Sequence, residues 1–415
     1  MRFLPLIVFL LALDTYAFQA FRTVAQNWAQ TTQTSFFILF WSIPILAIIL
    51  MFLYTNTNYA ETHKAVFSFL RAIVFIAYLS KVLIIALLLI DDFRRLGMRG
   101  YELFAGNKGF DYSRSQFLSK LGIALGSIPF LSLTYGIIRN PYRYKLFKQT
   151  VKVEGLPKKL DGLKIVQISD VHSGSFTFKE PVKNAIEMIN QQKADLVFFT
   201  GDLVNNVATE MEHFTDVFDK IKARFGVFSV LGNHDYGDYV AWPSQEHKIA
   251  NLEKLKDTHK KMGWQLLLNE NRLLDINEEK VAVIGVENYS AHPRFPKYGD
   301  LATAHRGTET AGLKLLLSHD PSHWHDQVTS SYQDIDITFS GHTHGMQFGI
   351  EIPGWIRWSP VQYVYKQWAG LYKSGRQFLY VNRGFGFLGY PGRVGILPEI
   401  TVMELKSDTA YTAET

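Results

Sequence analysis

The chain has 415 residues, a formal net charge of +5, no cysteine and 47% hydrophobic residues. This apolar content can form a large core, and together with only 20% charged residues it excludes intrinsic disorder as the general state. The lack of cysteine excludes a disulfide framework, a thiolate metal site and a cysteine nucleophile. The positive charge is modest for this length, so no nucleic-acid partner is expected.

Four long apolar runs dominate the first 140 residues. They cover about residues 3–21, 36–54, 72–90 and 118–138. Each has about the length that crosses a hydrocarbon core of roughly 30 Å, so residues 1–140 are predicted to form the transmembrane region of a multi-pass membrane protein. Arg2 before the first run would also suit a signal peptide. Asp14 interrupts that run and no clean cleavage site follows, which favours an uncleaved span.

The orientation of these spans stays open. One group of basic residues lies between the third and fourth runs and another follows the fourth run, on opposite sides of the membrane. The positive-inside rule therefore gives nearly a tie. With the N-terminus inside, four spans would place the following domain in the cytoplasm, which is the side that the span count favours.

Two charged residues lie inside the apolar runs, Asp14 in the first and Lys81 in the third. An unpaired charge in the middle of a bilayer is costly. We therefore expect the two side chains to face each other in the helix bundle or to line a small polar cavity. The alternative is that Lys81 extends to the membrane surface and Asp14 lies at an interface.

From residue 145 to 406 the sequence is typical of a soluble domain, followed by a short tail at 407–415. Strands are expected at 163–169, 194–200 and 225–231, with further short apolar runs at 264–268, 281–286, 313–318 and 335–340. Helices are expected at 181–192, 210–223 and 246–262. Strands that alternate with helices indicate a layered α/β domain, and the later closely spaced strands indicate a second sheet packed on the first.

Polar side chains with metal-binding chemistry follow five of these strands. The five segments are 169–172 (SDVH), 201–202 (GD), 232–235 (GNHD), 318–320 (SHD) and 341–345 (GHTHG). Each segment alone is typical of a turn or a surface loop. Five such segments in order, each at a strand end where α/β sheets bind their ligands, instead predict one functional site.

These motifs resemble those of the calcineurin-like metallophosphoesterases, in which D-x-H, G-D, G-N-H-[DE], H and G-H-x-H occur in this order. The C-terminal segment from 378 to 400 resembles a membrane-associated, bacterial-type branch of that family. The branch has Gly-Gly-Gln where this chain has Gly345-Met346-Gln347. The resemblance implies a sandwich of two sheets with helices outside both, in the order α/β/β/α.

The resemblance also implies two divalent metal ions. The first would be bound by Asp170, His172, Asp202 and His344. The second would be bound by Asp202, Asn233, His319 and His342, so that Asp202 bridges the pair. Imidazole and carboxylate donors suit manganese, which we expect, or iron, zinc or nickel, better than calcium. A hydroxide bridging the metals would then attack phosphorus in line, without a protein nucleophile.

The residues after Asn233 are the candidates for proton transfer. His234 would face the leaving oxygen as the general acid, and Asp235 would orient its imidazole by accepting a hydrogen bond. The alternative for His234 is a structural role beside the metals. Asp320 and His323 follow the ligand His319 and are expected to support the site or lie on the surface.

The sequence therefore predicts a membrane-anchored phosphoesterase that acts on phosphate mono- or diesters, with a lipid-linked phosphate as one candidate substrate. An inactive, metal-binding signalling relative and a transporter with an appended domain are the alternatives. The ligands distinguish neither monoesters from diesters nor one oligomeric state from another. The aromatic-rich stretch Ile352–Tyr372 is expected to lie beside the active site, either as a membrane-contacting surface or as ordinary core.

Overall fold

The computed structural model describes residues 3–57, 59, 63–105, 112–352 and 354–408. Most of the predicted tail lies outside these residues. The chain divides into two compact units, which are described separately here. One comprises Met1–Ile138 with Gly389–Pro391, and the other comprises Arg139–Leu388 with Gly392–Thr415.

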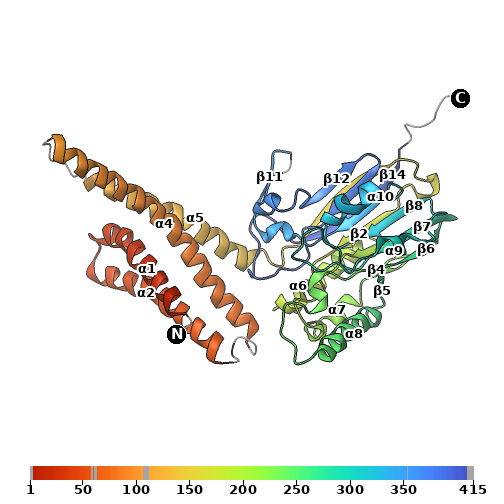
Figure 1. Cartoon of the computed structure of the whole chain (residues 1–415), viewed down its shortest axis with the longest axis horizontal. Helices are drawn as coiled ribbons and strands as arrows, with labels where there is room; N and C mark the ends of the chain where they lie inside the picture. The colour runs from red at the N-terminus through yellow and green to blue at the C-terminus, as the bar shows by residue number, and fades with distance from the viewer. Residues whose placement is uncertain (1–2, 58, 60–62, 106–111, 353, 409–415) are drawn as a thin grey trace. The chain divides into compact units, whose positions relative to one another are not determined.

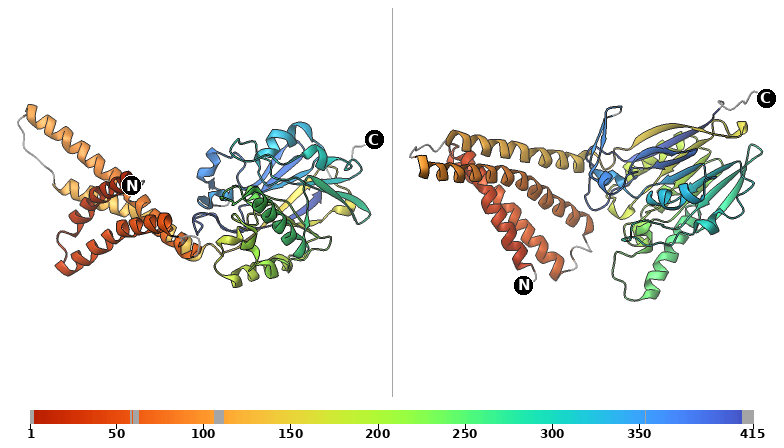
Figure 2. Two further views of the ribbon diagram at one scale, coloured as in Figure 1. Left: turned by 60° about the horizontal axis from the view of Figure 1, so that its bottom comes forward. Right: turned by 45° about the horizontal axis from the view of Figure 1, so that its top comes forward.

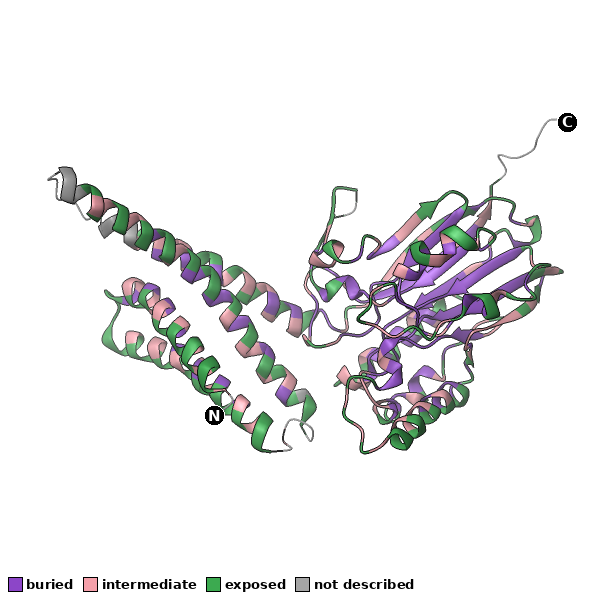
Figure 3. Ribbon diagram, viewed as in Figure 1, coloured by how far each residue is buried: buried purple, intermediate pink, exposed green. Residues whose placement is uncertain are grey.

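The first unit contains long helices that are apolar enough to cross a membrane (Figure 1). They are α1 (Leu4–Ala25), α2 (Gln30–Asn56), α4 (Lys64–Ala105) and α5 (Tyr112–Arg139). Each of the four predicted spans lies within one of these helices. Helix α4 is much longer than its apolar run because the helical backbone continues through a polar segment that includes Asp91 and Arg94. Many apolar side chains of this unit are exposed, as lipid-facing helices require (Figure 3).

The two charges inside the apolar runs form a buried ion pair, as the sequence predicted. The Nζ atom of Lys81 lies 2.5 Å from Oδ1 of Asp14, and the hydroxyl of Tyr78 donates to Oδ2 of Asp14 at 2.7 Å. Lys81 also lies 4.4 Å from the ring centre of Phe40. Asp14 is fully buried and Lys81 is 5% exposed. The alternative, in which Lys81 extends to the membrane surface, is therefore wrong.

The second unit contains two six-stranded mixed sheets. The first has the order β1–β14–β2–β3–β4–β5 and the second the order β12–β13–β9–β8–β7–β6. The first sheet comprises β1 (Lys145–Val153), β2 (Lys164–Ile168), β3 (Leu196–Phe199), β4 (Val227–Ser229), β5 (Gln265–Leu266) and β14 (Glu399–Ser407). The second comprises β6 (Glu270–Ile276), β7 (Glu279–Gly285), β8 (Leu313–Leu317), β9 (Ile337–Ser340), β12 (Gly370–Ser374) and β13 (Gln377–Val381).

Alternating side chains along the strands fill separate layers of core. In β3, Leu196 and Phe198 point into the layer between the two sheets, whereas Val197 and Phe199 point toward the helices. The outer layer of the first sheet packs against α6 (Lys179–Gln191), α7 (Thr215–Phe218) and α8 (Gln245–Lys261). The second sheet packs its outer face against α9 (Leu301–His305) and the segment around Trp324. Figure 2 shows these layers from two sides. The predicted α/β/β/α sandwich after four membrane-capable helices is confirmed.

One expected helix is largely wrong. Residues 210–223 contain only the end of a short 3₁₀ turn, Ala208–Met211, and helix α7, Thr215–Phe218. The apolar side chains that suggested the helix, including Phe214 and Ile221, are nevertheless buried in the core under the first sheet. A series of short turns can also bury residues at helical spacing. The spacing therefore predicted the burial of these side chains correctly but predicted their backbone conformation incorrectly.

Candidate metal centre

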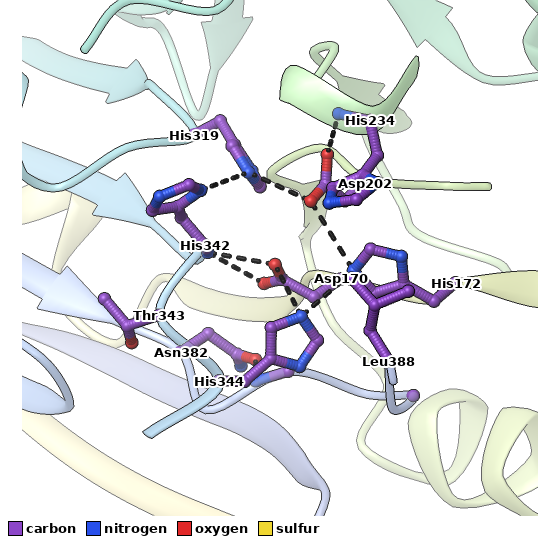
Figure 4. Close-up of polar contacts among 12 residues, drawn as sticks. Asp170, His172, Asp202, His234, His319, His342, Thr343, His344, Asn382 and Leu388 are labelled. Atoms are coloured by element: carbon purple, nitrogen blue, oxygen red, sulfur yellow. Dashed lines mark hydrogen bonds and ion pairs between the residues drawn. The ribbon is translucent and has the colours of Figure 1, made fainter. Parts of the chain in front are cut away.

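The five polar segments converge at one end of the sandwich (Figure 4). Strands β2, β3 and β4 run parallel in the first sheet, and β8 and β9 run parallel in the second. The carboxyl ends of parallel strands lie at the same edge of a sheet, so the following loops deliver their side chains to a common place. The alternation of short buried strands and polar loops in the sequence thus produces the site directly.

The backbone of this site is strained. Five of the seven expected ligands adopt the left-handed conformation: Asp170 (φ 53°), His172 (φ 47°), Asp202 (φ 62°), His342 (φ 69°) and His344 (φ 52°). Each such residue costs of order 1–3 kcal/mol and persists only where the surrounding structure enforces it. Hydrogen bonds between loops do so here, including those from the backbone N–H of Asp170 to Gly201 and from that of His172 to Asp202.

Two glycines let the loops approach one another. A Cβ atom on Gly232 would lie 2.2 Å from Oδ1 of Asp202, and one on Gly341 would lie 2.2 Å from Oδ2 of Asp170. Both distances are far below van der Waals contact. The glycine of each motif is therefore required by the position of an acidic side chain in a neighbouring loop.

The first group of donors comprises Asp170, His172 and His344, and all three residues are buried. The Nε2 atoms of His172 and His344 lie 3.0 Å apart, and Oδ1 of Asp170 lies 3.3 Å from Nε2 of His344. One donor atom from each side chain lies within 4.8 Å of the other two. This spacing fits three ligands of one cation.

The second group comprises Asp202, His319 and His342. The Nδ1 atom of His342 lies 3.2 Å from Nε2 of His319 and 2.8 Å from Oδ1 of Asn233. The amide nitrogen of Asn233 donates to the hydroxyl of Tyr239 at 2.8 Å, which turns Oδ1 toward the imidazoles. Oδ1 of Asn233 therefore lies against the two imidazoles of this group.

Asp202 lies between the two groups. Its Oδ2 atom is 3.3 Å from Nε2 of His319 in the second group and 3.5 Å from Nε2 of His172 in the first. Its Oδ1 atom accepts a hydrogen bond from the backbone N–H of His234 at 2.9 Å. One carboxylate oxygen thus faces both groups, which is the position that a bridging ligand requires.

Contacts behind the site fix which ring nitrogen of each histidine faces it. Nδ1 of His319 donates to the carbonyl of Thr200 at 2.7 Å, which leaves Nε2 for the site. Nε2 of His342 lies 2.8 Å from the hydroxyl of Tyr365, which in turn donates to Asp320 at 3.2 Å. Such outer contacts commonly orient metal-binding imidazoles.

The charge state of the site suits cations. Burial lowers the pKa of His172 to about 3 and that of His342 to about 4, so both imidazoles are neutral and can donate lone pairs. Burial raises the pKa of Asp170 to about 7, and the nearby Asp202 carboxylate adds to this effect. Burial alone would lower the pKa of His319, but the Asp202 carboxylate outweighs it and raises the value to about 10. A proton on His319 thus neutralises part of the negative charge of the carboxylates, which is the charge that a bound cation would otherwise neutralise. The donor set therefore fits divalent metals.

The expected hydrogen bond from the imidazole of His234 to the carboxylate of Asp235 is wrong. Oxygen atoms of the Asp235 carboxylate accept hydrogen bonds from backbone N–H groups of Gly232, Asp202 and Leu203 at 2.8–2.9 Å. Asp235 therefore positions the loops that carry the donors. The imidazole of His234 is held instead through Nδ1, which donates to the carbonyl of Asn205 at 2.7 Å.

Sequence reasoning gave no role to Asn205 or Tyr239, which orient His234 and Asn233. It placed Tyr365, which contacts His342, only within the aromatic-rich stretch 352–372. Asn205 and Tyr239 lie a few residues after the G-D and G-N-H-D motifs. This proximity was the only feature of the sequence that could have indicated their roles. The positions of Asp320 and His323 agree with supporting roles. Asp320 accepts from Tyr365, and His323 contacts Ser318 and Gln327.

Comparison with known proteins gives matches over both units. A family model described as calcineurin-like phosphoesterase matches residues 163–346, and one described as probable calcineurin-like phosphoesterase, transmembrane domain, matches residues 1–141. The uncharacterized metallophosphoesterase YkuE of Bacillus subtilis is 31% identical over 71% of this chain and 98% of its own length. A transmembrane protein with metallophosphoesterase domain from Danio rerio is 30% identical, over 66% of this chain and 60% of its own. An uncharacterized metallophosphoesterase of Campylobacter jejuni is 29% identical, over 66% and 67%.

Proposed function

Because the chain belongs to the calcineurin-like metallophosphoesterases, as its motifs predicted, and is a metal-dependent phosphoesterase, we propose that it hydrolyses phosphate mono- or diesters at a membrane with two divalent metal ions. The observation that carries this proposal is the position of Asp202. Its carboxylate belongs to the second group of three donors and also lies 3.5 Å from Nε2 of His172 in the first group, and the three donor atoms of each group lie within 4.8 Å of one another.

Asp170, His172, His344 and Asp202 would hold one metal, and Asp202, Asn233, His319 and His342 the other. Manganese is the cation that we expect, with iron, zinc and nickel as alternatives. When bound, a pair of such ions polarises a phosphoryl group and acidifies a water molecule. The neutral imidazoles of His172 and His342 and the fixed amide of Asn233 preorganise the binding positions.

His234 would donate a proton to the leaving oxygen. Its Nδ1–H is held by the carbonyl of Asn205, and its ring packs 4.5 Å from that of Tyr239 and 5.0 Å from that of His172, measured between ring centres. These contacts fix the ring plane and direct Nε2 toward the donors. Asp235 acts through the backbone, by holding the amides of Gly232 and Asp202 in place.

A lipid-linked phosphate is the substrate class that we favour. The last membrane-capable helix ends at Arg139 and strand β1 begins at Lys145, so only residues 140–144 connect them. Five extended residues reach at most roughly 18 Å, so the catalytic domain begins within that distance of the end of the helix. An even number of spans returns the chain to the side on which it starts, so a cytoplasmic N-terminus would place this domain in the cytoplasm.

The test uses the full chain purified in detergent, with p-nitrophenyl phosphate and bis(p-nitrophenyl) phosphate as substrates and manganese, iron, zinc or nickel added separately. Asp202→Asn removes the charge shared by both donor groups. It should lower turnover by at least about 10²-fold and reduce the metal content, because a main electrostatic contribution is lost. Asp216→Asn is the matched control, since Asp216 is exposed and pairs with Lys179 far from the donors.

Turnover of Asp202→Asn within tenfold of wild type, with two metals retained, would contradict the shared-ligand assignment. A wild-type protein that binds two metals but hydrolyses neither ester would favour the alternative of an inactive metal-binding signalling protein. Screening membrane lipid extracts with wild type and Asp202→Asn side by side then identifies the substrate class.

A further inference from the structure

A small hairpin separate from both large sheets follows the last metal-binding motif. It consists of β10 (Ile350–Ile352) and β11 (Ile356–Trp358), paired antiparallel. Ile350 pairs with Trp358, and Ile352 pairs with Ile356. Because side chains alternate along a strand, these four apolar residues share one face of the hairpin. The remaining pair, Glu351 and Arg357, lies on the other face.

The polar face is the one bound to the domain. Both carboxylate oxygens of Glu351 accept from Arg383, at 2.5 and 3.1 Å, and Arg383 is a buried residue that also pairs with Glu399 at 2.7 Å. Arg357 donates to the carbonyl of Ala369 at 2.8 Å and lies over the rings of Trp368 and Tyr372. Two charged side chains therefore attach the polar face of the hairpin to the domain.

Most of the apolar face is turned outward, and its fourth residue, Trp358, is half-buried against Phe348. Ile350, Ile352 and Ile356 are each at least 40% exposed, and Trp355 in the connecting turn is 82% exposed. The turn that follows β11, Pro360–Tyr363, adds exposed Tyr363 and Val364. Figure 3 shows this hairpin standing out from the domain in the colour of exposed residues. The apolar hairpin patch is formed by Ile350, Ile352, Trp355, Ile356, Tyr363 and Val364.

In a soluble protein a strand pair usually buries its apolar face. Here three of the four residues on that face are exposed, and Arg357 on the polar face is exposed as well. Contiguous exposed apolar surface marks a contact with a protein, a ligand or a membrane. The aromatic stretch divides accordingly. Tyr365 and Trp368 are core residues, whereas Trp355 and Tyr363 are exposed.

The patch is joined directly to the metal centre. The hydroxyl of Ser359 donates to the carbonyl of Gly345 at 2.8 Å, and the hydroxyl of Thr343 donates to the carbonyl of Trp368 at 2.7 Å. Tyr365, one residue beyond Val364, contacts His342. Ser359, between the hairpin and Tyr363, and the segment after Val364 are therefore hydrogen-bonded to the loop that carries His342 and His344.

We propose that the apolar hairpin patch inserts into the surface of the lipid bilayer in which this chain is anchored, so that the metal centre faces substrates in that bilayer. Three features favour lipid as the occupant. The short connection after Arg139 places the start of the domain close to the end of the last membrane-capable helix. Trp and Tyr are the aromatic residues preferred at bilayer interfaces, and the exposed Lys366 supplies positive charge for anionic headgroups.

The absence of cysteine from the sequence makes the location of the patch measurable. Trp355→Cys and Tyr363→Cys, each carrying a nitroxide spin label, are compared in the full chain reconstituted into bilayers of phosphatidylethanolamine and phosphatidylglycerol. Ile249→Cys is the matched control, since Ile249 is an exposed apolar residue on α8 outside the patch. Labels at 355 and 363 should be accessible to oxygen and protected from a water-soluble nickel relaxant, whereas the label at 249 should show the reverse.

Equal access of the nickel relaxant to all three labels would overturn the proposal. Protection of labels 355 and 363 from both oxygen and nickel would also overturn it, because it indicates contact with a second copy or another protein. These results require no catalysis, so they stand even if neither p-nitrophenyl ester is hydrolysed and the proposed function fails.

The role of the patch in substrate access rests on the proposed function and has its own readout. Trp355→Ser should lower hydrolysis of phosphatidic acid or phosphatidylglycerol in the same bilayers by at least about fivefold, because interfacial anchoring is lost. Hydrolysis of the soluble p-nitrophenyl esters should stay within twofold of wild type. A parallel loss of both activities together with a lower melting temperature would make Trp355 a structural residue and overturn the proposal.

Discussion

Neutralising one member of the buried Asp14–Lys81 pair should destabilise the membrane unit far more than neutralising both. The perturbations are Asp14→Asn and Lys81→Met, made singly and together. Each single variant leaves one charge among apolar side chains without its partner. Asp14→Asn keeps an acceptor for the hydroxyl of Tyr78, which now donates to Asp14 at 2.7 Å. This variant therefore isolates the loss of charge.

The magnitude follows from burial. Asp14 is fully buried and Lys81 is 5% exposed, and their charged atoms lie 2.5 Å apart. Removing one partner of a buried ion pair costs roughly 3–5 kcal/mol, and insertion scales assign about 2.5–3.5 kcal/mol to a single charge at the bilayer centre. The double variant has no buried charge and loses only hydrogen bonds, worth about 1–2 kcal/mol. We expect both single variants to lose about 3 kcal/mol or more and the double variant to recover most of this loss.

The assay is unfolding of the full chain in mixed micelles with increasing denaturing detergent, which gives a free energy of unfolding for each variant. Arg95→Met is the control, since Arg95 is 39% exposed and lies 3.5 Å from a half-exposed Asp92. Exposed pairs contribute at most about 1 kcal/mol, so this variant should hardly change the unfolding energy. Single variants that each lose under 1 kcal/mol, or a double variant whose loss equals the sum of the singles, would refute the reasoning.

Two further predictions concern the metal centre. His234→Ala should lower hydrolysis of alkyl phosphate esters by about 10²–10⁴-fold but affect p-nitrophenyl esters much less, because nitrophenolate leaves without a proton; equal losses on both substrates, or loss of metal, would assign His234 a structural or ligand role. Gly232→Ala should lower metal content and turnover, because the new Cβ would lie 2.2 Å from Oδ1 of Asp202. Gly263→Ala, which has no atom within 4 Å of its Cβ, should keep both metals despite a cost of about 1 kcal/mol for its positive φ.

The candidate donors of the metal centre could be predicted from sequence because each lies two to four residues after a strand end. Short buried strands are recognisable locally, and parallel strands bring their carboxyl ends together whatever the details of the loops. The same reasoning failed for Asp235, whose carboxylate binds backbone amides in the loop of Asp202, over thirty residues earlier in the chain. A side chain that acts on a distant backbone leaves no spacing pattern. The hydrogen bond from His234 to the carbonyl of Asn205 could not be predicted either, because every residue carries a backbone carbonyl.

The hairpin shows a second limit of sequence patterns. The alternation of isoleucine with Glu351, and of Ile356 and Trp358 with Arg357, predicts a strand pair with one apolar and one polar face. It does not say which face is buried, because that depends on what each face meets. Here Arg383, more than thirty residues away in sequence, binds Glu351, and the ring of Trp368 covers Arg357, so the charges are satisfied by the domain. The isoleucines then remain exposed and can contact a neighbour outside the domain. Under the proposed insertion that neighbour is the bilayer, and the same alternation that would stabilise a soluble core would serve to contact lipid.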